Sequence, residues 1–294
     1  MRSLVLVMAA CSAGPTQAQK TTSARAAHAP LSLAADDRMI AIPAGRFIAG
    51  STPEERATGY DDYFRTSGRD DARAHAWFDR EADRHVATLP GFRIDLMPVT
   101  QAQFAEFTSA EHIAVPSIDQ PEWQAQGLAQ DFATQVARFV WVDGRPPDGR
   151  EDHPVVLVPW VDADRYCTWR GALRGGKRRL PAADEFEKAA RGEGGIAYPW
   201  GNTFEPDKLN SVVQGPGDTT PVGTYPAGAS PYGVLDLAGN VFQWTATPGD
   251  DGKMVVKGSA WTEFAGIGRG ASLAEFPRTT RHVTIGFRCA GDEE

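Results

Sequence analysis

The sequence of 294 residues contains few cysteines, few histidines and no excess of positive charge. Its 30 lysines and arginines are outnumbered by 38 acidic residues, which gives a net charge of −8 at pH 7. An acidic chain is a poor match for a phosphate backbone, so we expect no nucleic-acid partner. Apolar residues make up 41% and charged residues 23% of the chain, proportions that are ordinary for a globular protein. A wholly disordered chain and a protein with several membrane spans are therefore excluded.

Long apolar runs are also absent, and the run at residues 4–10 is shorter than the roughly 20 residues of a membrane span. With Arg2 before it and small residues after it, this run is typical of a bacterial export signal. Residues 8–11 resemble a lipobox, which would leave a lipid on Cys11, whereas residues 16–18 resemble an ordinary cleavage site; an unprocessed cytosolic start is the third alternative. We assign residues 1–18 to the signal and predict a periplasmic protein, tethered to the membrane if Cys11 carries the lipid.

Only two cysteines, Cys167 and Cys289, lie beyond the signal. An even pair in an exported protein favours one disulfide, with two buried free thiols as the alternative. Residues 19–37 are small and polar and predict a flexible tether in front of the domain.

The rest of the chain, residues 38–291, is interpreted as one α+β domain with short elements and much ordered loop. Alternating apolar residues predict strands within 39–50 and 86–95. Helices are expected after the N-cap Thr100, from Trp160 to Trp169, and over 181–191 before Gly192. Residues 51–84 are dense in charges of both signs, which predicts a solvated surface excursion.

Motifs along almost the whole of this domain follow one another in a fixed order. They are IPAGRF at 42–47, PVTQAQF at 98–104, HPV at 153–155 with PWVDA at 159–163, RLPAADEFE at 179–187 with YPWGN at 198–202, PVG at 221–223, YGVLDLAGNVFQW at 232–244, and GFRC at 286–289. On these motifs the chain resembles the formylglycine-generating enzyme (sulfatase-modifying factor) family. The resemblance implies a single compact, loop-rich domain with little regular secondary structure, distantly like the C-type lectins.

The resemblance also implies a disulfide between Cys167 and Cys289, and structural calcium. Calcium takes six to eight oxygen ligands, which carbonyls at a Gly-Asn turn can supply in part. The family's second site maps onto Asp236, the carbonyls of Gly239 and Val241, and Gln243, where the family usually has Glu. Its first site maps onto Asn210, the carbonyl of Ser211, and Asp218 in a shortened loop. The alternative is that these residues only build turns.

Family members that generate formylglycine hold copper with two cysteines shortly after a Gly-Gly-Ser-Trp-like strand. That strand corresponds to residues 256–261 here, and Glu263 and Gly268 stand where the cysteines would be. Because a thiolate pair selects Cu(I), copper-dependent formylglycine generation is the least expected function. A nonheme-iron branch carries an extra domain with three histidines, whereas none of the six histidines here is paired at helical spacing.

An exported, PvdO-like branch of the family lacks the copper cysteines, and the chain is most similar to it. This implies a periplasmic protein that oxidises, or assists in oxidising, an aromatic or dihydroxyphenyl group of a secreted peptide, as in siderophore maturation; any redox metal is left open. The rival hypothesis is a noncatalytic binding or scaffold protein of the cell envelope, which a lipid on Cys11 would favour.

The site is expected around residues 257–261 and the loop that follows. Glu263 is the acid/base candidate, because a single carboxylate in an apolar stretch should have a raised pKa. Arg269 is assigned to an oxyanion or a substrate carboxylate. Trp261 and Trp244 are assigned to stacking on an aromatic substrate, and Ser259 to substrate binding. The alternatives are a core position for Trp261, a salt bridge for Arg269 and a solvated Glu263.

Overall fold

The computed structural model describes residues 37–128 and 131–293. The signal, and the tether up to residue 36, lie outside the described residues. The strands are β1 (Met39–Ile42), β2 (Gly45–Ala49), β3 (His85–Leu89), β4 (Phe92–Asp95), β5 (Phe242–Pro248), β6 (Lys253–Lys257), β7 (Ala274–Pro277), β8 (Ile285–Gly286) and β9 (Ala290–Asp292). The longer helices are α2 (Pro53–Ser67), α4 (Gln101–Glu111), α6 (Trp160–Leu173) and α7 (Ala183–Arg191). Short helical turns are α3 (Asp71–Ala74), α5 (Gln120–Ala125), η1 (Trp77–Arg80), η2 (Phe132–Val136), η3 (Ala137–Phe139), η4 (Pro206–Lys208), η5 (Pro226–Gly228) and η6 (Asp250–Gly252).

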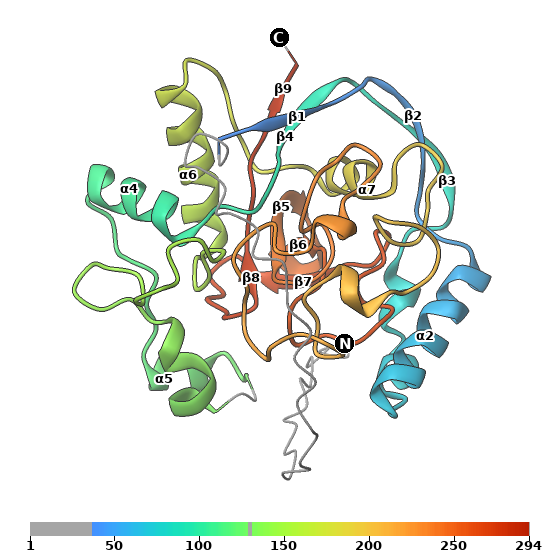
Figure 1. Ribbon diagram of the computed structural model, residues 1–294, viewed down its shortest axis with the longest axis horizontal. Helices are drawn as coiled ribbons and strands as arrows, with labels where there is room; N and C mark the ends of the chain where they lie inside the picture. Colours follow the sequence, from blue (N-terminus) through green and yellow to red (C-terminus); the bar gives the residue numbers. More distant parts are fainter. Residues whose placement is uncertain (1–36, 129–130, 294) are drawn as a thin grey trace, which may run out of the picture.

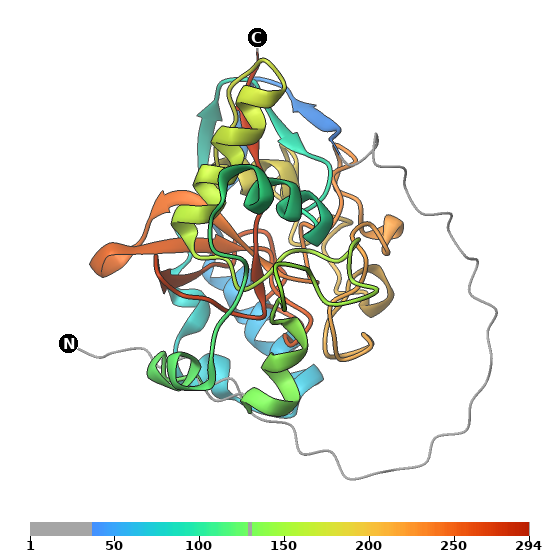
Figure 2. The same ribbon diagram turned by 90° about the vertical axis from the view of Figure 1, so that its left-hand side faces the viewer.

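The strands of the described residues form three small sheets, and the four-stranded one lies at the centre of the molecule (Figure 1). The largest has the order β7-β6-β5-β8, with β5 and β8 parallel and the other pairs antiparallel. The two segments predicted as strands run antiparallel to each other, so that β1 pairs with β4 and β2 with β3. Figure 1 shows α4 and α6 on one side of the large sheet and α2 on the other. Figure 2, from the side, places α4 and α6 together in front of it.

The predicted helices begin and end close to the capping residues that mark them in the sequence. The Thr100 hydroxyl accepts a hydrogen bond from the Gln103 backbone amide, and the Gln103 side-chain oxygen accepts one from the Thr100 amide, a capping box that starts α4. Gly192 follows the last residue of α7. The single α+β domain with much loop, predicted from the sequence, is confirmed. Among the described residues, no helix has the length and apolar character needed to cross a membrane.

The prediction of a solvated excursion at 51–84 is wrong. Thr52 and Glu55 form a capping box at the start of α2, and Tyr60, Tyr63 and Phe78 are buried against the main core. The apolar residues of this segment are aromatic and sparse, so their burial depends on contacts with distant parts of the chain. The charged residues that suggested solvation cover its outer face.

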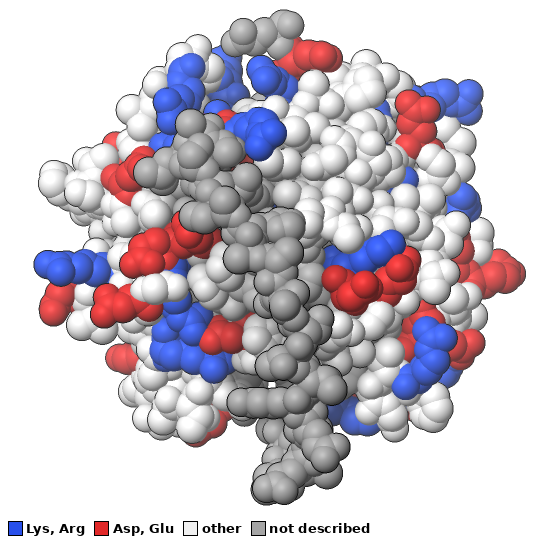
Figure 3. Space-filling model, viewed as in Figure 1, with Lys and Arg blue, Asp and Glu red and all other residues white. Residues whose placement is uncertain are grey.

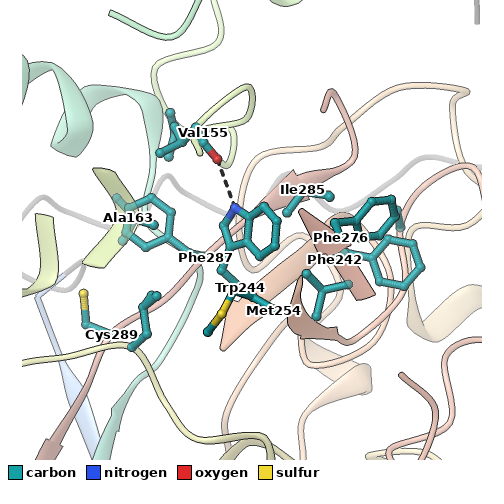
Figure 4. Packing of buried hydrophobic residues seen from close by; sticks show 14 of the residues in the cluster. Val155, Ala163, Phe242, Trp244, Met254, Phe276, Ile285, Phe287 and Cys289 are labelled. Atoms are coloured by element: carbon teal, nitrogen blue, oxygen red, sulfur yellow. Dashed lines mark hydrogen bonds between the residues drawn. The ribbon is translucent and has the colours of Figure 1, made fainter. Parts of the chain in front are cut away.

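The main core packs around Trp244, which is 0% exposed and whose indole N–H donates to the Val158 carbonyl at 3.0 Å (Figure 4). Phe242, Phe287 and Met254 lie around it. At the edge of this core a disulfide joins Cys167 on α6 to Cys289, which precedes β9. The bond therefore links the helical side of the molecule to its C-terminal strand.

Candidate functional site

The candidate site lies after β6, whose end is fixed by a buried ion pair. Lys257 Nζ donates to Glu187 Oε2 at 3.0 Å, and Arg191 Nη1 donates to the other carboxylate oxygen at 2.6 Å. Both cations come from elements of the core, β6 and α7. After β6 the chain turns, and the Glu263 amide donates to the Ala260 carbonyl at 3.0 Å. After this turn the chain reaches α2 through Phe264 and Ala265, whereas Trp261 packs against Phe139.

Glu263 is half-buried between its own loop and the segment 51–84. Desolvation raises the pKa of its carboxyl to about 7, against the Thr262 hydroxyl and the charge of Arg69, which lower it. The Thr262 hydroxyl donates to Glu263 Oε1 at 2.8 Å. The direction of this shift confirms what its apolar neighbours predicted. A carboxyl with a pKa near neutrality can both take and return a proton at physiological pH.

The C-terminal half of α2 forms one wall beside Glu263. The Tyr63 ring lies edge-on to the Phe264 ring at 5.7 Å, and the Ala265 amide donates to the Thr66 hydroxyl at 3.2 Å. Burial raises the pKa of Tyr63, and the charge of Glu263 acts in the same direction while Arg69 opposes it. This wall could not be predicted from the sequence, because neither Tyr63 nor Arg69 belongs to a motif.

Arg269 is buried in the protein and does not take the expected role of binding an oxyanion or a substrate carboxylate. It is 4% exposed and is ion-paired with the buried Glu81. It also donates to the carbonyls of Gly266 at 3.2 Å and Glu55 at 3.3 Å, and its guanidinium lies 4.5 Å from the Phe78 ring centroid. Its donors are thus taken by the protein, and Arg269 joins the segment 51–84 to the site loop.

Two glycines allow this close approach. A Cβ on Gly266, whose φ is +86°, would meet the Gly59 carbonyl oxygen at 2.4 Å, and a Cβ on Gly59 would meet Arg269 Nε at 2.5 Å. Side chains at either position would push α2 away from the loop that carries Glu263.

We expect Arg269→Met to lower the free energy of unfolding by about 3–5 kcal/mol, because it leaves Glu81 buried without its cation. Urea unfolding followed by circular dichroism measures this loss. Arg65→Met is the control, since Arg65 is 65% exposed in its pair with Asp62 and should cost less than about 1 kcal/mol. Equal effects of the two substitutions would contradict the structural role of Arg269.

The other expected substrate contacts lie within the protein. Trp244 belongs to the core, so its assignment to substrate stacking is wrong. Ser259 is 2% exposed, and its hydroxyl accepts from the Gly239 amide at 2.8 Å, so it does not reach a substrate either. Trp261 is 9% exposed and stacks on Phe139, with 6.2 Å between the ring centroids. Of the residues assigned to chemistry, Glu263 remains at an accessible position.

The residues of the second calcium site hold one another and do not fit the ion. Gln243 donates to the Asp236 carbonyl at 2.7 Å and accepts from Arg288 Nε at 2.6 Å. The Asp236 carboxylate accepts from the Gly223 amide at 2.9 Å, and the Gly239 carbonyl accepts from the Val241 amide at 2.9 Å. A buried guanidinium and an amide thus occupy oxygens that calcium would need.

The first calcium site fits in part. Asn210 Oδ1 is buried without a hydrogen-bond partner among the described residues, as a cation ligand would be. However, the Ser211 carbonyl accepts from the Gly215 amide at 2.7 Å, and the Asp218 carboxylate is bound by Arg150 at 2.5 and 3.0 Å. Calcium binding stays a prediction at this site alone, and because these contacts leave the ion one unshared oxygen, we expect it to bind weakly.

We expect chelation of calcium to change the melting temperature of the mature protein by less than about 2 °C. One amide oxygen falls well short of the six to eight oxygens that bind calcium tightly. Differential scanning calorimetry in EGTA, compared with millimolar calcium, measures the shift; magnesium is the control ion. A fall of about 10 °C in EGTA would show that calcium stabilises the fold.

The thiolate copper site of the formylglycine-generating enzymes does not fit these residues. Glu263 and Gly268 stand at the cysteine positions, and Cys167 and Cys289 are joined to each other. In the described part of the chain, no group of three or more His, Cys, Asp or Glu side chains is placed to hold a metal ion. The chemistry that the Glu263 carboxyl itself can supply is proton transfer.

Comparison with known proteins agrees with this architecture. A family model, the sulfatase-modifying factor enzyme 1-like domain, matches residues 25–293. The chain is 33% identical to inactive C-alpha-formylglycine-generating enzyme 2 of Mus musculus, covering 87% of this chain and 86% of that one. It is 34% identical to hercynine oxygenase of Mycolicibacterium smegmatis over 58% of this chain and 40% of the relative. The structure of PvdO from Pseudomonas aeruginosa has the same fold, with a TM-score of 0.64, 22% identity, and coverage of 87% of this chain and 94% of PvdO.

Proposed function

Since the chain belongs to the sulfatase-modifying factor enzyme 1-like family, we propose that it is an exported modifying protein that acts in the oxidation of an aromatic group on a secreted peptide. The family supports a modifying or oxidative role, because relatives are named as a formylglycine-generating enzyme and as hercynine oxygenases. The likeness to PvdO concerns the fold. The periplasm as the compartment, and a siderophore-type peptide as the substrate, are parts of this proposal.

The observation that carries the proposal is the half-buried position of the Glu263 carboxyl beside the wall formed by α2, where desolvation raises its pKa to about 7. A charged carboxylate at a half-buried position lowers the stability of the fold, and such groups are concentrated at functional sites. It stands in the loop after β6, at the position that corresponds to a copper-binding cysteine of the formylglycine-generating enzymes. The change from a thiol to a carboxyl replaces copper ligation with acid/base chemistry.

The reaction we propose is the oxidation of a dihydroxyphenyl group to a quinone. The ring loses two electrons and two protons, and dioxygen accepts both pairs and leaves as hydrogen peroxide. Glu263 accepts a phenolic proton as the electrons leave, which lowers the barrier because a phenolate is oxidised more readily than a phenol. Proton transfer by a positioned side chain of this kind contributes about 10²–10⁴-fold to a rate.

The test compares the secreted peptides of the producing cells with and without the gene, by mass spectrometry. We expect the deletion strain to accumulate a precursor that retains the two hydrogens the mature product has lost. An unchanged profile of secreted peptides would overturn the proposal.

A noncatalytic binding function is the second candidate, and one finding favours it: the mouse relative is named as inactive. Complementing the deletion strain separates the two. A gene that encodes Glu263→Gln should fail to restore the mature peptide if the protein is an enzyme. The same gene should restore the mature peptide fully if the protein only binds or assembles. The comparison requires that the wild-type and variant proteins accumulate to the same level.

A further inference from the structure

Two arginines lie against the aromatic side chains next to the proposed site. The Arg138 guanidinium is 5.1 Å from the Phe139 ring centroid and 5.5 Å from that of Trp261. The Arg150 guanidinium is 4.8 Å from the Phe139 centroid. Contacts between a cation and an aromatic face hold the guanidinium in place. Trp261, expected to stack on a substrate, thus supports an arginine instead.

The charges of this pair are not balanced. Within the described residues, both arginines have their ion pair with one carboxylate, that of Asp218. Arg150 binds it through two nitrogens at 2.5 and 3.0 Å and holds the pKa of Asp218 below its usual value, although desolvation acts in the opposite direction. Arg138 is 3.7 Å from the same carboxylate and makes one hydrogen bond, to the Gly217 carbonyl at 3.0 Å. Its side chain is 37% exposed, so a positive charge faces solvent there.

One loop, residues 210–218, connects this charge to the acid/base group. The Val212 amide donates to the Glu263 carbonyl at 3.2 Å, and the Gly217 carbonyl accepts from Arg138. Between these contacts the loop exposes two apolar side chains, Val212 at 36% and Val213 at 37%. The loop thus runs from the Glu263 backbone, past two exposed valines, to the Arg138 guanidinium.

We propose that Arg138 binds an acidic group of the substrate, so that the substrate class is an aromatic compound or peptide with a carboxylate near the reacting ring. This inference rests on the proposed function and names its substrate more closely. A guanidinium donates charge-assisted hydrogen bonds to a carboxylate in a fixed geometry. On the face shown in Figure 3, Lys and Arg are interspersed with Asp and Glu and form no large patch of one sign.

The test uses two probes with the same ring and opposite charges, 3,4-dihydroxyphenylacetate and dopamine. Isothermal titration calorimetry of the mature protein at low salt should show that the acid binds at least about tenfold more tightly than the amine. Arg138→Gln should weaken binding of the acid about tenfold, which is the loss of one such contact, and leave the amine unchanged. Arg138→Lys keeps the charge without the planar guanidinium, so its affinity for the acid should lie between those of the wild type and Arg138→Gln.

Arg165→Gln is the matched control, because Arg165 is 50% exposed and also lies 3.7 Å from an aspartate, Asp162, on α6. Equal affinities for the two probes, or equal losses in the two glutamine variants, would overturn the assignment of Arg138. Discrimination between the probes without any oxygen consumption would leave Arg138 as an anion site and remove the proposed function. Turnover of both probes with the same KM would keep the proposed function and remove the assignment of Arg138.

Discussion

Glu263→Gln is expected to lower the rate of substrate oxidation by about 10²–10⁴-fold, because glutamine cannot accept a proton. Oxygen consumption with a dihydroxyphenyl substrate measures the rate. In the wild-type protein, kcat/KM should rise with pH and level off above about pH 7, where the Glu263 carboxyl has lost its proton.

The same substitution should stabilise the fold at alkaline pH. The folded pKa of about 7 lies above the ordinary 4.5, so the folded state binds more protons than the unfolded state between these values. Stability therefore falls as the pH rises from about 4.5 to 7, and stays lower above that range. Glutamine removes this loss, which we expect to be roughly 1–3 kcal/mol at pH 8 and near zero at pH 4.

The control for both measurements is Glu111→Gln at the exposed end of α4, which should change neither the rate nor the stability beyond about 0.5 kcal/mol. If Glu263→Gln keeps full activity, the carboxyl is not the acid/base group. If the Glu263→Gln variant is less stable than the wild type at pH 8, the desolvation that raises the pKa of Glu263 is contradicted.

Replacing Cys167 and Cys289 together by alanine is expected to lower the free energy of unfolding by about 3–5 kcal/mol. The bond spans 122 residues, and closing so long a loop restricts the unfolded chain strongly. Both cysteines are 0% exposed, so some loss of packing adds to the effect. Urea unfolding at neutral pH measures the loss.

Cys11→Ala in the unprocessed chain is the control, because it removes the remaining cysteine without touching this bond. Its midpoint of unfolding should equal that of the wild type. A loss of less than about 1 kcal/mol in the double variant would show that the disulfide contributes little to the fold.

Much of the fold could be predicted because its signals are local or belong to ordered motifs. Thr100 and Gln103 mark the start of α4 in the sequence itself, and Gly192 marks the end of α7. The family resemblance rests on motifs from residue 42 to residue 289, and the family match confirms it. The burial of 51–84 could not be predicted, because it depends on the contact between Glu81 and Arg269, 188 residues apart.

The site was predicted less completely than the fold. The raised pKa of Glu263 follows from its apolar neighbours in the sequence, whereas Tyr63 and Arg69 reach it from a segment that no motif connects to it. Arg138 lies against Trp261 and comes from another such segment. Polar and aromatic residues that the sequence suggested as substrate contacts, Ser259 and Trp244, are buried in the protein. A side chain's type indicates what chemistry it can do, but its exposure is decided by tertiary packing.

The pKa of the Glu263 carboxyl tests the account most directly. It can be measured by ¹³C NMR titration of the mature protein labelled at glutamate carboxyl carbons, with Glu263→Gln to assign the resonance. We predict a pKa of about 7. A value near the ordinary 4.5 would mean that the carboxyl is solvated, and would remove the acid/base site on which the proposed function depends.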